Sequence, residues 1–61
     1  MNISTYMITF HTEFNGVRSD DIVTYINAFY PADAAERLHK SPVWTNVPNS
    51  VLIIDEIVRV K

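Results

Sequence analysis

His11 and Glu13 are the first residues in this chain whose types and spacing could support chemistry. They are two positions apart, so on a β-strand both side chains would point to the same face. Together with Asp20, Asp21 or His39, they could bind a metal ion or transfer a proton. The sequence shows no convergence of these groups, and two solvated polar residues near the end of a hairpin are the simpler interpretation. We therefore expect neither a metal site nor an acid–base pair.

The sequence lacks the other common motifs of enzymes. Gly16 is the only glycine, so no glycine-rich loop can bind a phosphate, and no cysteine is present to ligate a metal. No serine is accompanied by the placed histidine and acid that a nucleophilic triad requires. Asp55 and Glu56 interrupt an apolar stretch, which is typical of a β-bulge or of a charged sheet edge. We therefore expect a protein that is not an enzyme and has no cofactor.

Length and composition indicate one small domain over residues 1–61. A chain of 61 residues is near the lower limit for a self-sufficient core, so we expect it to gain stability from a partner or a second copy. The net charge of −2 argues against nonspecific binding to nucleic acid, which needs clustered basic residues. The longest apolar run, Val51 to Ile54, is too short to span a bilayer, and the first residues lack the pattern of a signal peptide. A cytoplasmic location is expected.

Two strands joined by a hairpin are predicted in the first half of the chain. Apolar and polar residues alternate over residues 3–14, as in a half-buried strand, and Asn15-Gly16 is a strong hairpin signal. Residues 22–29 form the second, antiparallel strand. A two-residue turn would pair Phe14 with Val17, whereas a loop with a bulge at Gly16 would pair Glu13 with Val17.

We favour the bulged register, because it places the small Ala28 where a helix must pass close over the strand. In that register the second strand presents Ile22, Thr24, Ile26 and Ala28 to the face that carries Tyr6 and Ile8.

A short helix and a third strand are predicted in the second half. Pro31 suits the first helical position, and Pro42 ends the helix after residue 40. The helix buries a narrow stripe of Ala34, Ala35 and Leu38. Residues 41–50 are expected to form an ordered loop, and residues 51–60 form the last strand.

The element order β-β-α-β favours a two-layer α+β fold. We expect a three-stranded antiparallel sheet, with the first strand in the centre (order 2-1-3) and the one helix packed on one face. The other face would then expose apolar side chains, and such a patch on a small protein typically marks an interface. Trp44, in the loop, would either cap the core or contact a partner. The candidate partner-binding residues are Met7, Tyr25, Ile53, Ile57 and Trp44.

The passage from VTYINAFYPADAAERL to VLIIDEIVRV, within residues 22–61, resembles small bacteriophage early proteins. The nearest family is that of the bacteriophage T7 inhibitor of host RNA polymerase, which is similar in size and in its order of strand, alanine-rich helix and final strand. The resemblance implies a class of small viral proteins that bind and disable a host macromolecule. It carries over no functional residue.

We therefore expect a phage-encoded protein–protein interaction module that binds a host protein and inhibits or redirects it. A homodimer could also close the uncovered face. The alternatives are a small nucleic-acid-binding protein and a structural homo-oligomer, such as a minor virion component. Tyr6, Phe10 and Phe29 could stack on bases, but the chain has few basic residues beside them, so binding to nucleic acid is not favoured.

Overall fold

A long central strand organises the sheet of this protein. The computed structural model describes residues 2–45 and 48–61, and β1 (Ser4–Phe14) runs through the middle of its sheet. All neighbours of β1 are antiparallel to it, with β2 and β3 on one side and β4 on the other. The α+β class and the central position of the first strand were predicted correctly. The outer strands are β2 (Val17–Arg18), β3 (Ile22–Ala28) and β4 (Ser50–Arg59).

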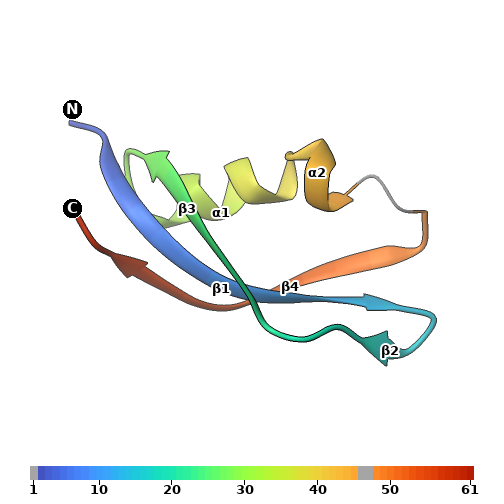
Figure 1. The fold of residues 1–61 in the computed structure, drawn as a ribbon. Helices are drawn as coiled ribbons and strands as arrows, with labels where there is room; N and C mark the ends of the chain where they lie inside the picture. Colours follow the sequence, from blue (N-terminus) through green and yellow to red (C-terminus); the bar gives the residue numbers. More distant parts are fainter. Residues whose placement is uncertain (1, 46–47) are drawn as a thin grey trace.

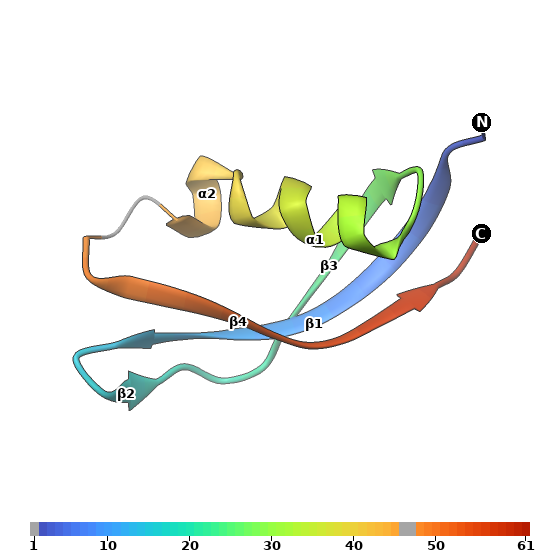
Figure 2. The same ribbon diagram turned by 180° about the vertical axis from the view of Figure 1, so that it is seen from behind.

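Both helices lie on the same side of the sheet (Figures 1 and 2). The first is α1 (Pro31–His39), which has the predicted proline at its start. The second, α2 (Pro42–Thr45), occupies a segment that was predicted to be a loop. No helix in residues 2–45 and 48–61 is long and apolar enough to cross a bilayer. Neither helix of the described residues lies on the opposite side of the sheet, as expected for a two-layer fold.

The hairpin between β1 and β2 is a two-residue turn. Asn15 and Gly16 have φ values of 52° and 79°, so both adopt the left-handed conformation that such a turn requires. Phe14 therefore pairs with Val17. The predicted pairing of Glu13 with Val17 was wrong, because the turn itself contains no bulge.

The extra residue lies instead between β2 and β3. The Ser19 N–H donates to the Thr12 carbonyl oxygen at 2.8 Å, and the Thr12 N–H donates to Ser19 Oγ at 2.9 Å. Two positions further along β1, however, Phe10 pairs with Ile22. Residues 20–21 thus stand opposite the single β1 residue between Phe10 and Thr12, which makes a bulge.

Because of this bulge, β3 presents to each face of the sheet the residues that were predicted there, although the predicted turn was wrong. Tyr6 pairs with Ile26 and Ile8 pairs with Thr24, so the expected side chains of β3 do face the helices. Ala28 is completely buried beside α1, as its small size had suggested.

A second bulge lies in β4. Thr9 pairs with Glu56 and Phe10 pairs with Ile54, so Asp55 is the extra residue between them. The interruption of the apolar stretch at Asp55-Glu56 is therefore a bulge, one of the two structures that the sequence indicated.

Because of the β4 bulge, the residues after Asp55 lie on the opposite face of the sheet from the one that simple alternation predicts. Ile57 pairs with Ile8 and packs against the core, so its predicted place on the uncovered face was wrong. Val58 pairs with Met7 and takes that place instead.

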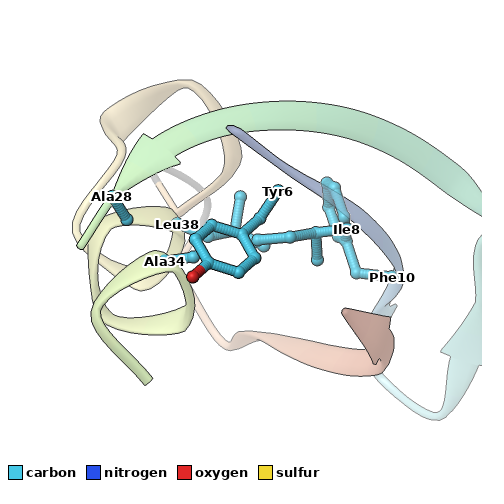
Figure 3. Packing of buried hydrophobic residues seen from close by; sticks show 6 residues of the cluster. All are labelled: Tyr6, Ile8, Phe10, Ala28, Ala34 and Leu38. Atoms are coloured by element: carbon cyan, nitrogen blue, oxygen red, sulfur yellow. The ribbon is translucent and has the colours of Figure 1, made fainter. Parts of the chain in front are cut away.

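The core lies between β1 and the helices (Figure 3). Ile8, Phe10 and Leu38 are its largest fully buried side chains. Trp44 of α2 packs against Phe10 with a centroid distance of 5.2 Å and an interplanar angle of 76°, so it closes one end of this core. The buried apolar residues are Tyr6, Ile8, Phe10, Ala28, Ala34 and Leu38.

Candidate functional site

The uncovered face of the sheet has an apolar half near the chain ends. Met7 lies in the centre, paired with Tyr25 on one side and with Val58 on the other. Cross-strand partners share a face, so these three side chains form one row across the sheet. Tyr25 is 62% exposed and Val58 is 39% exposed. Val23, two positions from Tyr25 along β3, lies on the same face and is also exposed. We call this group, formed by Met7, Val23, Tyr25 and Val58, the apolar row.

The structure brings together only some of the predicted interface residues. Met7 and Tyr25 are direct neighbours. Ile53 lies on the same face but pairs with His11, further along β1. Ile57 belongs to the core face, and Trp44 packs on Phe10 as a core cap. Val58 was missed, because the position of the β4 bulge decides which face it occupies.

The other half of the uncovered face is organised around a buried imidazole. His11 is only 5% exposed, although no helix covers this side. Its Nδ1–H donates to Asp55 Oδ2 at 2.8 Å, and its Nε2 lies 3.4 Å from Glu13 Oε2. Both carboxylates are themselves partly exposed, so His11 is shielded by acidic side chains whose outer atoms remain in contact with solvent.

Asp21 completes this arrangement from the opposite side of β1. One side-chain ligand atom each from His11, Asp21 and Asp55 lies within 4.8 Å of the others. Asp21 also accepts a hydrogen bond from Arg18 Nη2 through Oδ1, at 2.7 Å. We call the group formed by His11, Glu13, Asp21 and Asp55 the His11 cluster.

Both bulges contribute to the His11 cluster. Asp55 is the extra residue of β4, and Asp21 is part of the bulge that precedes β3. In the sequence, His11, Glu13 and Asp21 had been considered together, whereas Asp55 had not been connected with them. His39 cannot join them, because it lies on α1 on the other side of the sheet.

The half of the sheet around the His11 cluster is strongly acidic. Four of the seven acidic residues of the chain lie in or next to the two bulges, and a fifth, Glu13, lies on β1 two positions from His11. The remaining two, Asp33 and Glu36, are on α1 and form ion pairs with Arg37 and Lys40. The five residues around the bulges are Glu13, Asp20, Asp21, Asp55 and Glu56.

A hollow is present on the protein at the hairpin end of the sheet. Arg18 is the only charged residue among the described residues that line it, and its surface is mainly apolar. Its lining residues are Thr12, Phe14, Asn15, Val17, Arg18 and Ser19.

No protein-family model, curated protein or solved structure matches the chain. The resemblance to phage inhibitors of host RNA polymerase therefore stays an expectation from the sequence.

Proposed function

We propose that this chain is a non-enzymatic protein-binding module and that the uncovered face of the sheet is its binding surface. The observation that carries the proposal is the apolar row, which crosses three strands on a side without a helix (Figures 1 and 2). Each Å² of apolar surface left in water costs roughly 25 cal/mol, so covering the row would be favourable. Exposed apolar patches on small proteins commonly mark binding surfaces.

The partner that fits this face is a protein surface with apolar side chains flanked by lysine or arginine. The apolar row would take the apolar part, and the acidic half next to it would attract the basic part. A nucleic acid would meet carboxylates where it needs cations, so the acidic half argues against that alternative.

A second copy of this chain matches the acidic half less well. Three of its five basic side chains already form ion pairs within the molecule. They are Arg18, Arg37 and Lys40, and the last two lie on α1 and directly after its end, away from this face. A partner with free basic side chains therefore gains more from the acidic half than a homodimer would.

In its narrower form, the proposal is a phage-encoded inhibitor that acts in the host cytoplasm. Its support is the resemblance over residues 22–61, the small size and the absence of cysteine. A module of this kind would inhibit or redirect a host macromolecule by occupying its surface, without chemistry of its own.

Differential affinity capture from a bacterial lysate tests the proposal. The immobilised wild type is compared with Tyr25→Glu in the apolar row, Glu56→Lys in the acidic half, and Val43→Glu as a control. Val43 is 75% exposed on α2, on the helix side of the sheet, so its substitution leaves the uncovered face unchanged. We expect a set of proteins that bind the wild type and the control but are lost with both face variants and at high salt.

Three results would contradict the proposal. If both face variants retain the same proteins as the wild type, the uncovered face is not the binding surface. If sedimentation shows a wild-type dimer that Tyr25→Glu dissociates, the occupant is a second copy. If the retained material is nucleic acid, the alternative function is correct. Circular dichroism of each variant ensures that a lost interaction does not reflect unfolding.

A further inference from the structure

We infer that the His11 cluster is a binding site for a divalent first-row transition-metal ion, of which Zn²⁺ is the probe. The inference is independent of the proposed protein-binding function. It rests on the position of the ligand atoms, their chemistry, the backbone that carries them and the charge around them.

The ligand atoms are close to the separations that a metal ion requires. Bonds of 2.0–2.2 Å in a tetrahedral site place neighbouring ligand atoms about 3.3 Å apart. In the structure, ligand atoms of His11, Asp21 and Asp55 all lie within 4.8 Å of one another, and Nδ1 is 2.8 Å from Asp55 Oδ2. Small side-chain rotations of the two aspartates, with release of the Nδ1 proton of His11 to solvent, would therefore be enough to enclose an ion.

The donor set favours a transition metal over a hard cation. Mg²⁺ and Ca²⁺ are bound mainly by oxygen atoms, whereas an imidazole nitrogen combined with carboxylates suits Zn²⁺ and its neighbours. The His11 side chain is only 6% exposed, so its orientation is fixed before an ion arrives. The Asp55 and Glu13 side chains are 37% and 41% exposed, which leaves a path for the ion to enter.

The backbone around His11 is irregular on both sides. β1 is flanked at this point by the bulge at residues 20–21 and by the bulge at Asp55, and each bulge supplies one aspartate to the cluster. In a regular ladder, each neighbouring strand places one residue opposite each residue of β1, whereas a bulge places two residues opposite one. Bulges re-aim side chains in this way, and they are frequent next to functional sites.

The charges of the cluster also favour a cation. Three carboxylates, of Glu13, Asp21 and Asp55, surround one imidazole. Arg18 compensates one of them through Asp21 Oδ1, which leaves the second oxygen of that carboxylate for an ion. A divalent cation would relieve the repulsion between the remaining negative charges.

Calorimetric titration of the full chain with Zn²⁺ tests the inference. Mg²⁺ and Ca²⁺ are titrated in parallel, and Co²⁺ is added as a spectroscopic probe of the ligand geometry. His11→Gln and Asp55→Asn remove predicted ligands, while His39→Gln is the matched control on the other histidine, exposed on α1. We expect one Zn²⁺ per chain, little heat from Mg²⁺ or Ca²⁺, an affinity at least about tenfold lower in both ligand variants, and no change in the control.

NMR of the histidine rings provides a test that needs no variant. Zn²⁺ should shift the ring signals of His11 and leave those of His39 unchanged, and a chelator should reverse the shift. The inference is overturned if His39 responds instead, if neither ring responds, or if Mg²⁺ and Ca²⁺ bind as tightly as Zn²⁺. If His11→Gln does not fold, Asp21→Asn and Asp55→Asn are compared with Glu56→Gln, which lies beside the cluster, and equal Zn²⁺ affinity in all three would overturn the inference.

Discussion

Gly16 has a backbone conformation that other L-residues rarely adopt, with a φ of 79°. Apart from Gly16 itself and its two chain neighbours, no heavy atom of the described residues lies within 4 Å of the place that a Cβ would occupy. A side chain at this position would therefore meet no steric obstacle from its neighbours, and the whole cost of a substitution would come from the strained backbone.

We expect Gly16→Val to lower the free energy of unfolding by about 2 kcal/mol, because a β-branched residue is strained in the left-handed region. Urea denaturation followed by circular dichroism measures this loss. The control is a chain made by chemical synthesis with D-alanine at position 16, since a D-residue favours positive φ and should cause no loss. Equal destabilisation by valine and by D-alanine would show that the left-handed turn is not what Gly16 contributes.

At the scale of the elements, the pattern of the sequence identified the three long strands and α1, and it offered a bulge as one interpretation of Asp55-Glu56, but it did not predict the bulge at residues 20–21. The stretch VLIIDEIVRV has apolar residues on both faces, so the faces of Ile57 and Val58 depend on where one extra residue is inserted. That position is set by pairing with β1, which local alternation does not contain. For the same reason, the contact between His11 and Asp55, which are 44 positions apart, could not be predicted from spacing.

The short helix α2 was missed for a different reason. Apart from Pro42 at its first position, this four-residue segment has none of the signals that mark longer helices. Its packing comes from Trp44 against Phe10, a tertiary contact. The sequence could therefore indicate order in this segment but not its conformation.

The start of α1 depends on one carboxylate. Asp33 Oδ2 accepts hydrogen bonds from the Phe29 N–H at 3.0 Å and from Arg37 Nε at 3.1 Å. The hydrogen bond from Phe29, and to a smaller extent Arg37, hold the pKa of Asp33 below its ordinary value of 3.8, against the opposing effect of partial desolvation. The ionised form is thus favoured in the folded protein, so it contributes stability above pH 3.8, and this contribution is lost as the pH falls through the lower, folded-state pKa.

We therefore expect Asp33→Asn to melt at a lower temperature than the wild type at neutral pH. The difference should shrink as the pH falls below 3.8 and through the lower, folded-state pKa of Asp33, because the wild-type carboxylate then becomes protonated as well. Thermal unfolding followed by circular dichroism across this pH range measures the difference. A gap between the two melting temperatures that stays constant down to the lowest pH would show that ionisation of Asp33 does not stabilise the fold.

At the scale of the whole molecule, the sheet is longer than the helices that cover it. The long axis measures 39 Å, close to the roughly 36 Å expected for the 11 residues of β1, whereas the 9 residues of α1 span only about 14 Å. The helices therefore leave the hairpin end uncovered, and Val17 there is 70% exposed. Stability must come from the small cluster of residues under α1 and α2.

A charge introduced into the core on the helix-covered face should therefore destabilise the protein far more than a charge introduced on the uncovered face. Leu38 is completely buried and Tyr25 is 62% exposed. We expect Leu38→Asp to unfold the protein, since an unpaired charge in the core exceeds the roughly 3–5 kcal/mol that a small domain can supply. Tyr25→Glu should change the free energy of unfolding by less than about 0.5 kcal/mol.

Thermal unfolding measured by circular dichroism compares these variants, with Ile26→Asp as an intermediate case because Ile26 is only partly buried. A cooperative transition of Leu38→Asp at the wild-type temperature would refute the assignment of the core. Unfolding of Tyr25→Glu would show that the uncovered face is part of the core.

The pairing of β1 with β4 also determines how the protein would respond to mechanical force. The beginning of β1 and the end of β4 are neighbours, because Tyr6 pairs with Arg59 and the Val60 N–H donates to the Thr5 carbonyl oxygen at 2.9 Å (Figure 1). Tension applied between Thr5 and Val60 would act across the ladder and along its hydrogen bonds, which run perpendicular to antiparallel strands. The bonds would therefore break one pair at a time, like a zipper, instead of resisting together in shear. A chain pulled from this end should yield at low force, and the break should travel along the ladder and reach the bulge beside His11 before the hairpin end opens.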